Sequence, residues 1–180
     1  MTISVTPEVF NFVSFDASLI REIAEGLVTA LALDEYSVAI EVDETTPLAR
    51  LAYQLTTDTI SIQAQSGAFE DTRKPRQQSE LATAIALGRA LLKAKDRATG
   101  GFADAPADEA LSLAQGAAWD VYALGRLERL GIAANQQRWR YNFRNRHGFS
   151  DRSDAAFDHL WASDSLTWDV LDKLSTQVAS

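Results

Sequence analysis

The sequence predicts an α+β protein in which a small antiparallel sheet of three or four strands packs on helices and is followed by a helical C-terminal half. Two observations carry this prediction. Apolar and polar residues alternate in three short segments between residues 36 and 65, as they do in half-buried strands. Apolar residues recur every three or four positions over 16–33, 78–97 and much of the chain after 108, as on the buried face of a helix.

The length of the chain predicts a single domain covering residues 1–180. A chain of this size buries roughly 70% of the surface that its unfolded form exposes, so one core is sufficient. Residues 1–70 would hold the first helix and the sheet, and residues 71–180 would be mainly helical. No repeat, low-complexity tract or long linker interrupts this organisation.

The first predicted helix runs from Asp16 to Leu33, where the apolar positions fall on one face. Asp16 is the expected N-cap, because its carboxylate can accept a hydrogen bond from an unpaired backbone N–H of the first turn. Before this helix, the aromatic-rich stretch 9–15 is a candidate fourth strand for the sheet. It has no clear period, so its strand assignment rests on composition alone.

Three strands are predicted over 36–42, 51–55 and 60–64. The links between them are short, so consecutive strands should run in opposite directions and pair as an antiparallel meander. The outward rows of side chains are polar, which predicts one solvated face and one face covered by helices. Ile62 belongs to the apolar row and is expected in the core.

The second half of the chain is predicted to be helical after a polar loop over 67–76. In the first of these helices, Leu81 is expected on the buried stripe. Gly100 and Gly101 end that helix, and Gly131 ends the next one. The helices are expected over 78–97, 108–130, 155–162 and 166–178.

The composition limits the kinds of site that the chain can form. The chain has no cysteine and only two histidines, His147 and His159, with no HExxH or similar ligand spacing. We therefore predict no disulfide, no metal site and no cofactor, and a fold that forms without metal. The N-terminus lacks the features of a secretory signal, and no apolar run approaches the ~20 residues that cross a bilayer. These observations predict a cytoplasmic protein with no membrane span.

Charge is distributed unevenly along the chain, which carries a formal net charge of −8. Residues 1–70 hold two arginines against eleven carboxylates, a balance of −9, whereas residues 71–152 have a balance of +5. The acidic total argues against nucleic acid as a partner of the whole protein. A local basic surface in the second half of the chain would still be compatible with binding of nucleic acid there.

The order of a helix, a short sheet and a long helix over about residues 16–97 resembles the front half of compact zincin-like metalloproteases. In that family the long helix carries the zinc-binding HExxH motif. The corresponding stretch here, 79–92, reads SELATAIALGRALL and contains no histidine. The resemblance therefore implies a degenerate zincin-like fold without the family's metal chemistry, and it rests on the order of the elements.

The segment 135–149, NQQRWRYNFRNRHGF, mixes arginines with aromatic residues and contains no acidic residue. Guanidinium groups and aromatic faces suit an anionic ligand or single-stranded nucleic acid. A helix over 136–147 would instead bury Trp139 and Phe143 and leave the arginines in solvent or paired with the acidic first half. If the segment is a site, the binding residues would be Arg138, Arg140, Tyr141, Arg144, Arg146 and His147.

The remaining tryptophans, Trp119, Trp161 and Trp168, are expected in the core or at a self-association surface. No motif of nucleotide binding or of seryl catalysis is found, so no catalytic residue is predicted. The leading interpretation is a non-catalytic interaction or self-associating domain. The alternatives are a binder of a small anionic ligand or nucleic acid through 135–149, a degenerate zincin-like fold, or an enzyme whose site forms only in three dimensions.

Overall fold

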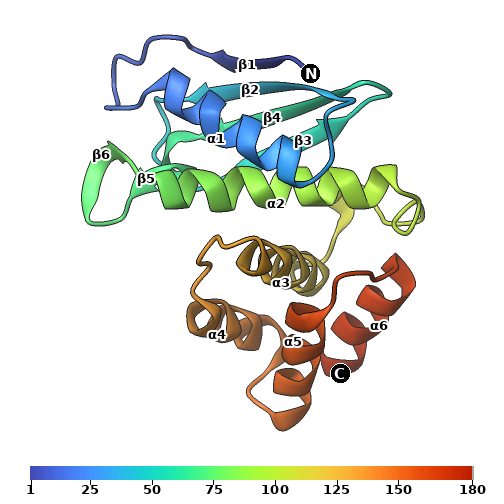
Figure 1. Cartoon of the computed structure of the whole chain (residues 1–180). Coiled ribbons are helices and arrows are strands. Elements are labelled where there is room, and N and C mark those ends of the chain that lie inside the picture. Colours follow the sequence, from blue (N-terminus) through green and yellow to red (C-terminus); the bar gives the residue numbers. More distant parts are fainter. Residues whose placement is uncertain (180) are drawn as a thin grey trace. The chain divides into compact units, whose positions relative to one another are not determined.

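The computed structural model describes residues 1–179 and confirms the α+β class, with strands in the first half of the chain and helices toward the end (Figure 1). Two compact units are present, residues 1–95 and the residues from 96 onward. The boundary between them falls inside the helix α2 (Glu80–Ala98). The single-domain organisation stays a prediction.

Four strands of the first unit form one sheet with the order β1-β2-β4-β3. Their bounds are β1 (Ile3–Thr6), β2 (Ser37–Asp43), β3 (Leu51–Leu55) and β4 (Thr59–Gln65). β1 pairs parallel with β2, β2 pairs parallel with β4, and β3 pairs antiparallel with β4. The sheet is therefore mixed, with the antiparallel strand β3 at one edge.

The predicted antiparallel meander is wrong, because β4 lies between β2 and β3. The strands β2, β3 and β4 do alternate in direction, as the short links between them require, but β2 has β4 as its neighbour, with Ile40 opposite Ile62. Alternation along a strand decides which face is buried and does not choose the adjacent strand. The central strands β2 and β4 carry the fully buried rows, whereas the side chains of the apolar row of β3 are only half-buried.

The helix α1 (Ala17–Ala30) lies across one face of the sheet (Figure 1). Asp16 is its N-cap, as predicted, and accepts a hydrogen bond from the Ser18 backbone N–H at 2.8 Å. Near the other end of α1, the Lys95 ammonium of α2 donates to the Leu31 carbonyl oxygen at 2.7 Å. Ile62 is buried in the core of this unit, as predicted.

The stretch 9–15, a candidate strand in the sequence, belongs to a loop, and the fourth strand is β1 instead. This loop is held by a carboxylate. Glu44, which is nearly buried, accepts hydrogen bonds from the backbone N–H groups of Asn11 and Phe12 at 2.8 and 2.6 Å. A backbone whose N–H groups are bound to a side chain cannot extend a strand ladder, which explains why composition was misleading here.

Two further details of the first unit differ from expectation. The polar loop over 67–76 contains a small hairpin, β5 (Glu70–Asp71) paired with β6 (Lys74–Gln78). Leu81 is 47% exposed, so its assignment to the core is wrong. It lies six positions before the buried Leu87 in α2, which places the two side chains about 120° apart around the helix axis.

The second unit contains the last turn of α2, a short 3₁₀ helix (Asp108–Ala110) and four α-helices, and its helical character confirms the prediction for the second half. The helix predicted from residue 108 begins later, after a capping box between Ser112 and Gln115. The one predicted from 155 begins earlier, after the N-cap Ser150. The helices are α3 (Leu113–Arg129), α4 (Gln136–His147), α5 (Asp151–Ala162) and α6 (Trp168–Ala179).

The core of the second unit combines stacked rings with one buried ion pair. Phe102 stacks on Trp119 with ring centroids 4.8 Å apart, and Trp168 lies 5.7 Å from Trp119. The Asp96 carboxylate accepts two hydrogen bonds from the Arg126 guanidinium and one from the Trp119 indole, at 2.7 to 2.8 Å. Trp119, Trp161 and Trp168 are buried, which confirms their prediction as core residues.

Candidate interaction surface

The helix predicted over 136–147 is α4, and Asn135 caps its N-terminus with its side-chain oxygen. Its buried face is made by Phe143 and His147, whose rings stack with centroids 3.8 Å apart. Phe157 of α5 meets Phe143 edge to face at 5.7 Å. Trp139, also expected to be buried, is half-buried. The apolar contact of this helix with the unit is thus an aromatic stripe.

Two of the predicted binding arginines are engaged by carboxylates of α5. Arg144 forms two hydrogen bonds with Asp154 at 2.7 and 2.8 Å, and Arg140 pairs with Asp158. The Arg140 guanidinium also lies 4.4 Å from the centre of the Phe157 ring. The expected partners in the acidic first half are therefore wrong for these two arginines. Their charges are compensated within the helical unit.

His147, another predicted binding residue, is buried and hydrogen-bonded at both ring nitrogens. Its Nδ1 lies 3.1 Å from the Phe143 carbonyl oxygen, which can only accept, so Nδ1 carries the proton. Its Nε2 then accepts from the Ser175 hydroxyl at 3.2 Å. Burial lowers the pKa of His147, against the hydrogen bond to Phe143, which raises it. The side chain supports the packing of α4 rather than a solvent-facing site.

The opposite side of α4 is exposed, and we call it the α4 outer face. It comprises Arg138, Tyr141, Asn142, Asn145 and Arg146 of the helix together with Phe149 beyond it. Tyr141 and Phe149 are 58% and 63% exposed, and their rings meet edge to face at 5.9 Å. No carboxylate among residues 1–179 forms an ion pair with Arg138 or Arg146.

Phe149 is the residue of this surface that the predicted binding set lacked. Gly148, the C-cap of α4, has φ of +92°, a conformation that side chains other than glycine's rarely adopt. The turn at Gly148 directs the chain back, so that Phe149 packs on Tyr141, which lies eight positions earlier in the sequence. The glycine after a polar helix was the available signal, since it marks a C-cap.

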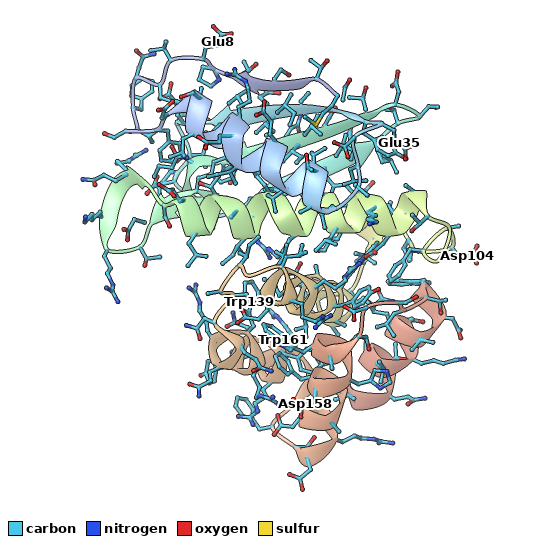
Figure 2. All side chains as sticks on the ribbon, viewed as in Figure 1. Glu8, Glu35, Asp104, Trp139, Asp158 and Trp161 are labelled. Atoms are coloured by element: carbon cyan, nitrogen blue, oxygen red, sulfur yellow. The ribbon has the colours of Figure 1, made fainter. Side chains whose placement is uncertain are left out.

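A second exposed apolar set lies in the first unit, on the loop between β1 and α1. We call it the 8–12 loop. Val9 and Phe12 are 73% and 65% exposed, and Figure 2 shows Glu8 pointing away from the ribbon. The Glu44 carboxylate holds the backbone beneath these side chains. Sequence reasoning assigned this stretch to the sheet and therefore missed it as a surface.

The stretch 79–92, which occupies the position of the zinc-binding helix of zincins in the order of elements, contains no histidine, and Glu80 is its only carboxylate. Thr83 is buried and donates its hydroxyl hydrogen to the Ser79 carbonyl oxygen at 2.8 Å. Within the described part of the chain, no group of three or more His, Asp or Glu side chains could hold a metal ion. The zincin-like resemblance stays a prediction that rests on the order of the elements.

Comparisons with known proteins returned no match: no family model, no curated protein and no solved structure resembles the chain. None of the helices described between residues 1 and 179 combines the length and the apolar character of a transmembrane segment. The exposed side chains described above are therefore the basis for any functional inference.

Proposed function

We propose that the protein is a non-catalytic interaction domain that associates with further copies of itself through the α4 outer face. The observation that carries this proposal is the exposed, edge-to-face pair of Tyr141 and Phe149. Aromatic residues and arginine are enriched among the side chains that dominate binding energy at protein interfaces. An aromatic pair already held in one geometry loses little conformational entropy on binding.

Charge supports a partner of this same composition. The α4 segment contains no acidic residue, whereas the whole chain has a net charge of −8. Arg138 and Arg146 therefore form a local positive region on an acidic protein, and this region can complement an acidic surface region of another copy, against the general repulsion between two chains of the same net charge. A non-catalytic role agrees with the burial of His147 and Ser175, because a pair closed to solvent cannot reach a substrate.

The alternative of an anionic-ligand or nucleic-acid site has weaker support. It would use the four arginines 138, 140, 144 and 146 together, but Arg140 and Arg144 are paired with Asp154 and Asp158. Only two uncompensated positive charges remain, and counterion release from a polyanion scales with the number of phosphates neutralised. Binding of heparin or single-stranded oligonucleotide at physiological salt would favour this alternative.

Sedimentation velocity over a range of protein concentrations tests the proposal. The parent should associate reversibly, and the double substitution Tyr141→Ser with Phe149→Ser should weaken association at least about tenfold, as the loss of two interface anchors predicts. Leu113→Ser, which removes an exposed apolar side chain elsewhere in the unit, should leave association unchanged. A parent that stays monomeric at all concentrations, or equal association in all three proteins, would contradict the proposal.

A further inference from the structure

We infer that the surface that fills the α4 outer face is the 8–12 loop of a second copy of the chain. This inference rests on the proposed function and specifies it, because it names both halves of the contact. The loop offers Val9 and Phe12, and the helix face offers Tyr141 and Phe149. These are the four most exposed aromatic or β-branched apolar side chains among the residues that the structure describes.

The 8–12 loop is held in place before any contact forms. The Glu44 carboxylate accepts from two successive backbone N–H groups, those of Asn11 and Phe12. A few residues further on, the Ser14 N–H donates to the Arg76 carbonyl oxygen at 2.7 Å. Both anchors act on main-chain atoms and leave the Val9 and Phe12 side chains in solvent. A loop fixed in this way pays little ordering entropy on binding.

The two surfaces are complementary in charge. Glu8 stands beside Val9 on the loop, and the unit that carries the loop, residues 1–95, has a net charge of −5. The helix face has Arg138 and Arg146 at its two ends and no acidic residue between them. Opposite charges at the rim of an apolar contact raise the rate of encounter and select the correct partner surface.

The two surfaces are also similar in extent. Arg138 and Arg146 are eight helical residues apart, which corresponds to about 12 Å along the axis. Val9 and Phe12 are three residues apart, and an extended chain covers at most about 10 Å over that interval. The two apolar side chains of the loop can therefore lie between the two arginines, against Tyr141 and Phe149.

A contact between two different surfaces has a consequence for assembly. Each copy carries one loop and one helix face, so a bound pair still exposes one of each. Such a heterologous contact continues into rings or open chains, whereas a symmetric contact stops at the dimer. The parent should therefore form species larger than dimers as its concentration rises.

Mixing two variants tests the inference. The loop variant carries Val9→Ser and Phe12→Ser, which leaves the backbone bonds to Glu44 in place, and the face variant carries Tyr141→Ser and Phe149→Ser. Each variant alone should be monomeric in sedimentation velocity. An equimolar mixture should form a one-to-one dimer and nothing larger, because only one productive contact is left. Far-UV circular dichroism and melting temperature check that both variants fold.

Each other outcome has a distinct meaning. If the loop variant associates like the parent while the face variant is monomeric, the inference is overturned and the proposed function stands, with α4 faces meeting symmetrically. If the face variant associates like the parent, both the inference and the proposed function are contradicted. If the parent stays monomeric and binds single-stranded oligonucleotide, and Arg138→Gln with Arg146→Gln abolishes that binding, the α4 outer face serves nucleic acid and both the inference and the proposed function are overturned.

Discussion

Asp96 is the residue on which the polar part of the second unit's core depends. Its carboxylate neutralises Arg126 and accepts the indole hydrogen of Trp119, and both charged side chains are about nine-tenths buried. The Arg126 guanidinium also lies 3.6 Å from the centre of the Tyr122 ring. Each of these buried charges has lost its hydration and depends on the other for compensation, so removal of either one leaves an unpaired charge in the core.

We expect Asp96→Ala to lower the free energy of unfolding by about 3 to 5 kcal/mol, because it leaves the Arg126 charge buried without a counter-ion. Urea unfolding followed by circular dichroism measures the change. Asp169→Ala is the control, since it removes an exposed pair with Lys173 one helical turn away and should cost at most about 0.5 kcal/mol. Similar losses in the two variants would contradict this account of Asp96.

His147 should make the stability of the protein depend on pH. Burial lowers the pKa of the folded imidazole below 6.5, the ordinary value that the unfolded chain retains. The unfolded state therefore binds the proton first as the solution becomes acidic. Stability is fully present above about pH 6.5 and is lost as the pH falls toward the folded pKa, by up to about 1.4 kcal/mol per pH unit.

Denaturant midpoints measured at several pH values between about 7.5 and 5 should reveal this slope. His147→Gln should remove it, whereas His159→Gln, which changes an exposed side chain, should retain it. The pKa of Asp154 is lowered from 3.8, chiefly by the hydrogen bond from Arg144, so its contribution is lost only in more acidic solution. A slope that persists without His147 would assign the effect to another group.

At the scale of elements, the contact between α3 and α5 depends on a missing side chain. A Cβ atom at Gly125 of α3 would lie 2.0 Å from the Trp161 carbonyl oxygen and 2.7 Å from its carbonyl carbon. Both atoms belong to the backbone of α5, so no rotamer change can relieve the overlap. The two helices approach this closely only because residue 125 is glycine.

Gly125→Ala should therefore destabilise the second unit by about 1 to 3 kcal/mol or more, as overpacking in a core does. Gly116→Ala provides the matched control on the same helix, because a Cβ there meets nothing within 4 Å. Alanine has the higher helix propensity, so this second change should raise stability by roughly 0.5 to 1 kcal/mol. Thermal unfolding of both variants measures these changes. A Gly125→Ala protein as stable as Gly116→Ala would contradict the close approach of the two helices.

Patterns within one segment of the sequence predicted the helices and strands well, but they did not predict which elements lie next to one another. Asp16 and the alternation around Ile62 belong to single segments, and both predictions are confirmed. The insertion of β4 between β2 and β3 depends on packing between segments, which no periodicity encodes. The loop around Phe12 resembled a strand in composition, but the side chain of Glu44, more than thirty residues away, binds its backbone.

The candidate surface was predictable in part for the same reason. The helix over 136–147 and the burial of Phe143 follow from spacing alone. Spacing did not show that Asp154 and Asp158 would engage two of the arginines, because these acids reach them from a different helix. It also could not separate Tyr141, which remains in solvent, from His147, which packs inside.

At the scale of the whole molecule, the two proposed contact surfaces belong to different units, residues 1–95 and the residues from 96 onward. The first unit presents the 8–12 loop and the second presents the α4 outer face. A chain with both surfaces needs no other protein to assemble, and its assembly should weaken as salt screens the charges at the rim.

The ring cluster of Phe102, Trp119 and Trp168 offers a way to observe the two units separately. All four tryptophans of the chain lie at or after residue 119, in the second unit. Tryptophan fluorescence therefore reports on the helical unit alone, because the sheet unit contains no tryptophan. Indoles 5.7 Å apart couple their electronic transitions, so Trp119 and Trp168 should also give a near-ultraviolet dichroic band that vanishes when this unit melts.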